Sequence, residues 1–480
     1  MALTISRNAP AAARPKSAPT ESPSTPPSTG RSSSTIVLIA ALLSFFIISL
    51  DGSVVNVALP AIGHSLRGGM SSLQWVVDGY TLMFAALMLS AGAFSDRIGA
   101  NRAYAVGLGA FTLASAACGF APGLGTLIGA RMVQGAAAAI MVPTSLALIR
   151  QTYADAAKRA RAVAIWTAAG AVAVAIGPVA GGALTAGLGW RSIFFLNLPV
   201  GAVGLALLAR IPQSPRREAP LDMLGQLSVM ISLATLTYAV IESGRLGFGS
   251  PTIIGMLVVS ALAMGVFLLA QARRAQPMVP LGLFRNRTVL VCIAAGFALN
   301  AVFYGVIFLF GLFFQQVRGE SPVSAGAMFI PMCGLIAVVN MASVKLAAKT
   351  GPRVPMVLGQ LIMGSGALVL LAVTAGAPAW VPVLLLVPIG IGGGLAVPSL
   401  TAVLLESVPA EWAGTAAAVL NTFRQVGGCL AVAVFGALIA DRATFQHGMH
   451  VSLVASVIML AVTAAATLFL LPRSGSRTNA

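Results

Sequence analysis

Charged residues are scarce in this chain. They make up 9% of its 480 residues, and 58% of the residues are hydrophobic. An average soluble protein is roughly 25% charged. The mean hydropathy is +0.93. This composition excludes an ordinary soluble protein and indicates a polytopic membrane protein built from apolar segments.

The chain also has few residues of the kinds that build metal centres, disulfide frameworks and enzyme active sites. The four cysteines lie far apart, each inside an apolar run, and we interpret them as small hydrophobic residues: Cys118, Cys292, Cys333 and Cys429. The three histidines fall in or next to predicted outer loops with no paired nucleophile: His64, His447 and His450. A Walker loop is absent, which excludes ATP as the direct energy source. We expect no enzyme activity, no metal and no cofactor.

Acidic residues are the rarer charged class. Twelve Asp and Glu oppose 29 Lys and Arg, which gives a formal net charge of +17. The basic residues are spread over short loops and do not cluster on a soluble domain, so a nucleic-acid-binding face is excluded. Their distribution is informative about membrane topology instead.

Apolar runs of about 20 residues, long enough to cross roughly 30 Å of hydrocarbon, predict fourteen helices after a disordered tail at 1–34 that is rich in Pro and Ser. The tail lacks the apolar core and cleavage site of a signal peptide, so we expect the first span to stay in the membrane. The predicted starts are Thr35, Leu73, Arg102, Leu124, Arg161, Arg191, Asp222, Pro251, Thr288, Val323, Arg353, Trp380, Trp412 and His450.

The loops alternate in basic content. With the tail inside, 22 of the 29 Lys and Arg fall in cytoplasmic segments and five in outer loops. The positive-inside rule therefore predicts a multi-pass protein of the cytoplasmic membrane with both termini cytoplasmic. The other two basic residues, Arg131 and Arg424, lie inside predicted spans.

The chain repeats itself weakly. Segments 135–149 and 390–404 share a glycine and a Val-Pro step at an offset of 255. Two similar six-helix halves fit this repeat and are typical of secondary transporters, whose sites lie near the bilayer midplane between the halves. The predicted division is an N-terminal half at 35–211, two extra helices with linkers at 212–287, a C-terminal half at 288–472 and a cytoplasmic tail at 473–480.

Four segments resemble the motifs of a known family: LDGSVVNVALP at 50–60, GAFSDRIGANR at 92–102, LIGARMVQGAAAA at 127–139 and GPVAGG at 177–182. Through them the chain resembles the major facilitator superfamily and, within it, the fourteen-span drug:proton antiporters, including methylenomycin-resistance-like and multidrug-resistance-like exporters. The resemblance covers nearly everything after the tail.

The resemblance implies an all-α major facilitator fold of two six-helix halves plus two extra central helices. It also implies a proton-coupled antiporter that exports small lipophilic drugs, antibiotics or toxins. The expected partners are protons, a small-molecule substrate and the lipid bilayer, with the chain acting as a monomer. A proton-coupled importer, or an exporter of a metabolite, would share the fold. The GPVAGG segment resembles a motif typical of exporters and argues against import.

Asp51 is an acid in the middle of the first predicted span, and ionisable residues at such depth are costly and usually functional. On the helix predicted from Leu124, Arg131 shares one face with Gln134 and Gly135, and a buried arginine expects a partner. Asp51 and Arg131 are therefore candidates for proton coupling. A permanent ion pair that only orients two helices fits the same pattern.

Asp78 is a second acid inside a predicted span, beside Trp75 and Tyr80. An acid with aromatic neighbours suits a proton carrier or a site for a lipophilic cation. An interfacial residue that reaches headgroup water would give the same pattern. We include Asp78 among the candidates for proton coupling.

A charged turn follows the helix predicted from Leu73. We expect Asp96 to face the positive amino end of the helix predicted from Trp412, as part of a latch that closes the cytoplasmic side. A solvated turn is the alternative. The family motif usually has basic residues where Ala100 and Asn101 stand, so the contacts of this loop are expected to be weaker. The predicted latch residues are Gly92, Asp96, Arg97, Gly99, Arg102, Glu406 and Glu411.

Small residues in the GPVAGG segment remove side-chain bulk and one backbone donor, which allows a bend and close contact with the other half. A plain packing kink would look the same. The residues of this predicted helix-bend motif are Gly177, Pro178, Gly181 and Gly182.

The second half places an aromatic wall where the first half has its acid, because Phe303 and Tyr304 correspond to Asp51 at the repeat offset. This predicts that one half handles protons and the other an apolar substrate. Arg424 lies deep in its span, and no acid stands inside a predicted span of its half, since Glu406 is near the inner surface. The candidate residues for a substrate cavity are Gln134, Tyr80, Trp166, Asn300, Phe303, Tyr304, Asn421 and Arg424.

Overall fold

The computed structural model describes residues 31–211, 213–214, 216, 222–274, 277–409 and 412–471, and the regular secondary structure in these ranges is helical. The predicted tails lie outside them, except that residues 31–34 already belong to the first helix. Each of the fourteen predicted starts falls within five residues of the beginning of a described helix. Hydrophobic run length therefore located the helices well.

The helices fall into three groups along the chain. The first contains α1 (Arg31–Leu66), α2 (Met70–Ile98), α3 (Ala100–Gly119), α4 (Leu124–Thr152), α5 (Ala156–Leu188), α6 (Ser192–Phe195) and α7 (Asn197–Leu208). The second contains α8 (Met223–Leu246) and α9 (Pro251–Arg273). The third contains η1 (Leu281–Arg285), α10 (Arg287–Leu312), η2 (Phe313–Val317), α11 (Pro322–Ala327), α12 (Ile330–Thr350), α13 (Arg353–Val369), η3 (Leu370–Ala372), α14 (Trp380–Glu406), α15 (Ala413–Leu438), η5 (Arg442–Thr444) and α16 (Phe445–Leu470).

Twelve of the helical segments in the described ranges are long and apolar enough to cross a membrane. These helices identify the chain as a multi-pass membrane protein. The helix α3 is not among the twelve, and the apolar segment Ser192–Leu208, which α6 and α7 form, is shorter. The predicted number of fourteen spans stays a prediction.

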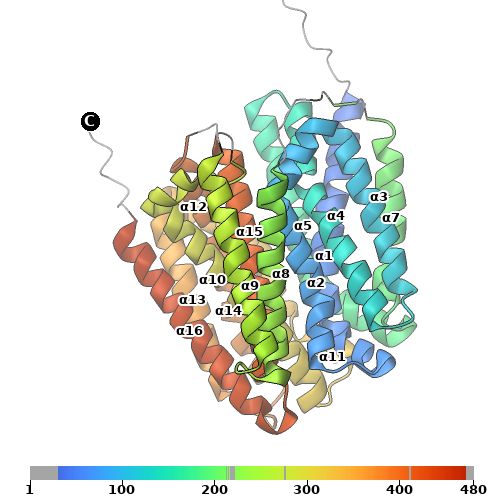
Figure 1. Ribbon diagram of the computed structural model, residues 1–480, viewed down its shortest axis with the longest axis vertical. Helices are drawn as coiled ribbons and strands as arrows, with labels where there is room; N and C mark the ends of the chain where they lie inside the picture. The colour runs from blue at the N-terminus through green and yellow to red at the C-terminus, as the bar shows by residue number, and fades with distance from the viewer. Residues whose placement is uncertain are drawn as a thin grey trace, which may run out of the picture.

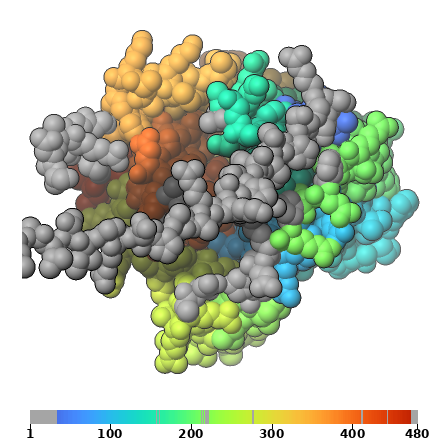
Figure 2. Space-filling model, turned by 90° about the horizontal axis from the view of Figure 1, so that it is seen from above, coloured from blue at the N-terminus to red at the C-terminus, as the bar shows by residue number. Residues whose placement is uncertain are grey.

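The first and third groups form two halves of the molecule. In Figure 1 the blue-to-green helices of the first half lie on one side and the orange-to-red helices of the second half on the other. The start of α1 and the end of α16 lie at the same end of the molecule, which we call the terminal end. Figure 2 looks onto this end and shows the two halves on opposite sides.

The helices α8 and α9 pack on each other across the front of the molecule (Figure 1), and α8 contacts both α2 and α15. Polar groups fix α8 to α2 near both of its ends. The Ser71 hydroxyl donates to the Glu242 carboxylate, and the Gln226 amide donates to the carbonyl of Ala86 over 2.9 Å. The additional pair therefore covers the seam between the halves.

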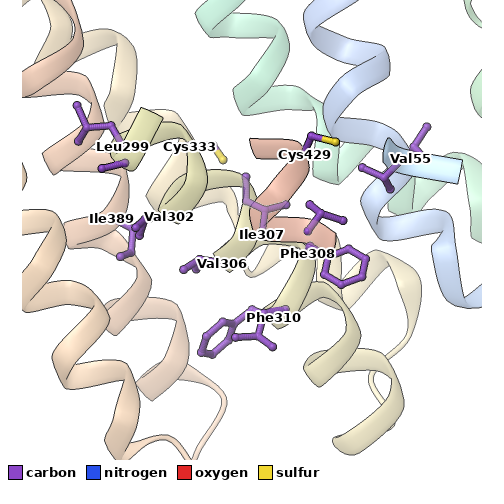
Figure 3. Packing of buried hydrophobic residues seen from close by; sticks show 14 of the residues in the cluster. Val55, Leu299, Val302, Val306, Ile307, Phe308, Phe310, Cys333, Ile389 and Cys429 are labelled. Carbon is purple, nitrogen blue, oxygen red and sulfur yellow. The ribbon is translucent and has the colours of Figure 1, made fainter. Parts of the chain in front are cut away.

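The helix α10 forms the core of the second half, because apolar side chains cover all of its faces and it packs on α14, α15 and α16. Figure 3 shows Val302 beside Ile389 of α14, and Ile307 and Phe308 on the side of Cys429 of α15. A helix that is apolar on all sides is typical of a position enclosed by other helices.

The halves meet at the end opposite the terminal end. Within the described ranges, two side chains make the hydrogen bonds that directly join them. The Gln74 amide of α2 donates to the carbonyl of Ala433 over 2.7 Å, and the Gln315 amide of η2 donates to the carbonyl of Val57 over 2.9 Å.

Two glycines let the backbones of α5 and α11 approach at this same end. A Cβ on Gly182 would lie 2.3 Å from the carbonyl oxygen of Pro322, and a Cβ on Gly326 would lie 2.1 Å from that of Pro178. Such distances are too short for any side chain, and small residues commonly permit this kind of contact between membrane helices. The GPVAGG segment is therefore in close contact with α11 of the second half.

This contact predicts the effect of one added methyl group. Gly182→Ala should push α5 from α11 and cost about 1–3 kcal/mol of overpacking, which would lower the unfolding temperature of the purified protein. Gly187→Ala is the control, because nothing lies within 4 Å of a Cβ there. Equal unfolding temperatures for the two variants would contradict the tight contact.

Candidate functional site

The structure brings Asp51 of α1 and Arg131 of α4 together as a buried ion pair, with the Arg131 Nη1 donating to Asp51 Oδ2. The two residues are 3% and 1% exposed, respectively. The Arg131 Nε donates to the carbonyl oxygen of Val76 over 3.1 Å, which ties the pair to α2. A charge pair this far from solvent is stable only when its other polar atoms are also satisfied.

Three further buried side chains complete the hydrogen bonds around the pair. Asn197 of α7 donates to Asp51 Oδ1 over 2.9 Å. Gln134 donates to the Ser115 hydroxyl of α3 over 2.7 Å and accepts from Arg131 Nη1 over 2.9 Å. Sequence analysis missed Asn197 and Ser115 as individual site residues. The Asn within the apolar stretch FFLNLPVG was the available signal, because an amide inside a span needs partners.

Close packing of α2 on α4 encloses the arginine. A Cβ on Gly135 would lie 2.1 Å from the carbonyl oxygen of Tyr80, so only glycine fits. The Tyr80 ring then stacks on the guanidinium of Arg131 with 4.3 Å between the ring centre and Cζ. Cation–π contacts of this kind strengthen when water is excluded. Gln134 and Tyr80, predicted to line a substrate cavity, thus belong to the environment of the ion pair.

Asp78 lies on α2, fully buried, where α2 meets α8 and α15. Neither carboxyl oxygen makes a hydrogen bond within the described part of the chain. The Cys429 thiol of α15 lies next to this carboxyl group, and the Thr237 hydroxyl of α8 lies 3.7 Å from that thiol. A buried carboxyl group without a hydrogen-bond partner is costly in such a place.

The predicted latch residues are not joined to one another here. Asp96, Arg97 and Glu406 are exposed, and no ion pair among them occurs in the described ranges. Arg102 donates to Gln213 over 2.8 Å. Gly99, with φ of 91°, forms the turn between α2 and α3, and Gly92 lies within α2 with nothing within 4 Å of an added Cβ. Glu411 lies outside the described residues.

Arg424 of α15 lies beside α10. Its Nε donates to Asn300 Oδ1 over 3.2 Å and its Nη1 to Asn421 Oδ1 over 3.4 Å. Its other electrostatic neighbour is Tyr304, whose ring packs edge-on against Phe303 with centres 5.4 Å apart. These five predicted cavity residues are therefore close together.

Two other groups of predicted residues lie apart from this cluster. Trp166 stacks on Phe45 with ring centres 3.8 Å apart, next to α1 and α4. In the helix-bend motif, a Cβ on Gly177 would lie 1.8 Å from the Ser53 hydroxyl, and one on Gly181 would lie 2.7 Å from the carbonyl oxygen of Val54. The GPVAGG segment therefore contacts both α1 and the other half.

All four cysteines are free and buried, as their interpretation as small hydrophobic residues requires. Among the described residues, no group of three or more His, Cys, Asp or Glu side chains is arranged to hold a metal ion.

The family model of the Major Facilitator Superfamily matches residues 41–432. The chain belongs to the Major Facilitator Superfamily. Its fold agrees with this assignment: a D-xylose-proton symporter aligns with a TM-score of 0.67 at 13% identity over 93% of this chain and 99% of its own. A POT family transporter in complex with 5-aminolevulinic acid aligns with a TM-score of 0.70 at 11% identity over 92% and 96%.

Curated relatives match over most of their length. The methylenomycin A resistance protein of Streptomyces coelicolor is 36% identical over 87% of this chain and 89% of its own. The multidrug resistance protein Stp of Mycobacterium tuberculosis is 37% identical over 84% and 76%. The tetracenomycin C resistance and export protein of Streptomyces glaucescens is 31% identical over 84% and 76%.

The ion pair yields a prediction about stability. Arg131→Met leaves Asp51 buried without its cation and should cost about 3–5 kcal/mol. Asp51→Leu combined with Arg131→Met should cost less than the single change, because no charge remains unpaired. Unfolding temperatures of the purified variants measure both effects. A double variant less stable than Arg131→Met alone would show that the apolar replacements themselves are not tolerated.

Proposed function

We propose that this protein is a proton-coupled antiporter that exports small lipophilic drugs, antibiotics or toxins. The observation that carries the proposal is the buried carboxylate–guanidinium pair. The relatives that the chain matches over most of their length are named as resistance and export proteins. An acid in that position suits proton transfer during a transport cycle. Efflux from a pump-deficient host that expresses the chain, with and without a proton gradient, tests the proposal.

The proposed topology has fourteen spans in the cytoplasmic membrane, with both termini cytoplasmic. The two spans beyond the twelve would be α3 and the segment formed by α6 and α7. The positive-inside rule and the placement of both described chain ends at one end of the molecule support it. In this arrangement the terminal end is cytoplasmic, and the contacts of Gln74, Gln315 and Gly182 close the outer side.

Cysteine labelling tests this topology. A cysteine at Ser250, between α8 and α9, should react with a membrane-impermeant thiol reagent added outside intact cells. A cysteine at Ser214, after α7, should react only in inverted vesicles. The native cysteines are buried, so background labelling should be low. The reverse pattern would overturn the topology.

Asp51 is proposed as the acid that couples protons to transport. The proton affinity of a carboxyl group in a medium of low dielectric depends strongly on whether a cation and hydrogen-bond donors contact it. Arg131 and Asn197 lie on different helices from Asp51, so a movement of α1 relative to α4 and α7 would separate the carboxylate from its cation and from its amide donor. Asp78 is proposed as a second protonation site, because its carboxyl group has no hydrogen-bond partner among the described residues.

Proton release measures this role directly. Asp51→Asn should abolish proton-driven efflux and substrate-induced proton release by the purified protein in weak buffer. Substrate binding should remain largely intact, because the amide oxygen can still accept from Arg131. Asp78→Asn is the companion variant. If Asp51→Asn still releases protons and pumps at the normal rate, Asp51 only orients α1 and α4, and the coupling acid is Asp78.

The latch is proposed to form in the state in which the cytoplasmic side is closed. Asp96 and Glu406 are exposed and form no ion pair with a described residue here, while the opposite end holds the contacts between the halves. Asp96→Asn should therefore reduce efflux strongly while membrane expression stays near normal, because the charge acts in another state. A loss of expression in proportion to activity would mean that Asp96 has a structural role.

Import on the same fold is the second candidate function. The GPVAGG segment, which contacts α11 at the closed end, favours export through its resemblance to the exporter motif. A transport assay in inverted vesicles, with substrate supplied on the cytoplasmic face, separates the two functions. An exporter accumulates substrate inside the vesicle when the proton gradient is directed outward from it. An importer does not.

A further inference from the structure

Two arginines lie deep inside the helices of this protein, and their surroundings differ. Arg131 is paired with the Asp51 carboxylate. The hydrogen bonds of Arg424 within the described ranges go to amide oxygens, and no described carboxylate forms an ion pair with it. The acids described in the second half lie at helix ends or in loops: Glu320, Glu406 and Asp441. A cation in the membrane without a carboxylate partner is costly.

Residues of α10 shape the surroundings of Arg424. Gly296 of α10 makes room for its stem, since a Cβ there would lie 3.1 Å from Arg424 Cγ. Asn300, one turn further along α10, accepts from Nε and donates to Gln425 Oε1 over 3.4 Å. The Nη2 atom donates to no described group. The guanidinium is therefore oriented by two asparagines while part of its hydrogen-bonding capacity stays free.

Arg424 lies deep within α15 and is partly exposed. It lies eleven residues past the start of α15, which is about 16 Å along the helix. Arg424 and Asn421 remain partly exposed at this depth, in contrast to Arg131. A lipid headgroup would have to leave the interface to reach such a depth. A small molecule that enters between the halves would not.

Aromatic side chains lie next to the free guanidinium. Tyr304 lies near Arg424 and near Tyr80 of the other half. Phe303 packs against Tyr304. The cation thus borders an apolar surface at the junction of the two halves, where transporters of this architecture bind their substrates.

We propose that Arg424, oriented by Asn300 and Asn421, forms a subsite that binds the carboxylate of an otherwise apolar substrate. Guanidinium groups bind carboxylates through two parallel hydrogen bonds, and the strength of such bonds rises in a dry environment. The apolar part of the substrate would lie on Phe303 and Tyr304. This inference rests on the proposed export function and names the substrate class for it.

Ligand binding to the purified full chain tests the subsite without transport. The probes share one apolar body and differ in charge: biphenyl carboxylate, biphenyl carboxamide and biphenylmethylammonium. Thermal stabilisation at neutral pH gives an apparent Kd for each. The carboxylate should bind wild type about tenfold more tightly than the amide, as expected for one charge-assisted contact.

Variants assign the preference to Arg424. R424Q should remove the tenfold preference, and R424K should keep part of it, because an ammonium retains the charge but not the planar geometry. Arg287→Gln is the control, since this arginine is exposed at the start of the same α10 and should leave the preference unchanged. A purely structural Arg424 would lower the unfolding temperature without ligand and leave the ratio of the two Kd values as in wild type.

Three results would overturn the proposal: equal binding of carboxylate and amide to wild type, a preference that survives R424Q, or tightest binding of the ammonium probe, which would point to Asp78 instead. If R424Q does not fold, R424K decides, because it must weaken the carboxylate more than the amide. Carboxylate binding without proton-driven efflux would leave the subsite standing and contradict the proposed function.

Discussion

The cost of burying charge in a medium of low dielectric dominates the organisation of the N-terminal half. Arg131 and Asp51 can lie inside the membrane only because α1, α2, α3, α4 and α7 each supply a group to their network. Removing any one of these groups leaves a buried donor or acceptor unsatisfied. The same requirement makes the pair sensitive to movement, since a shift of one helix changes the balance of the whole network.

Glycine is the second constraint, because it sets how closely the helices approach. Gly135 brings α2 onto α4 around Arg131, Gly296 admits the stem of Arg424, and Gly182 and Gly326 join the halves at the closed end. In the membrane, helix association depends on close packing, because lipid is as apolar as the side chains. The small residues therefore place the charged ones, and the polar network and the contact between the halves share one physical origin.

The two halves divide the chemistry unequally. The first holds a saturated network around an ion pair, while the second holds a partly exposed cation beside aromatic rings. Asp78 lies where both halves and α8 meet, so it can respond to a change in their relative position. Tyr80 stacks on Arg131, and Tyr304 lies near Arg424.

The sequence by itself determined the membrane class, the helix positions and the presence of Asp51 and Arg131 as a candidate pair, because hydrophobic run length and the rarity of charge inside a span are local properties. Motif resemblance supplied the family. Only the tertiary structure decided that Asn197 and Ser115 complete the network and that Arg424 has amides for partners. It also decided that Asp78 has no hydrogen-bond partner among the described residues. Those facts depend on which faces of helices distant in sequence meet, and an apolar helix of Gly, Ala and Val carries too little periodicity to specify its facing partners.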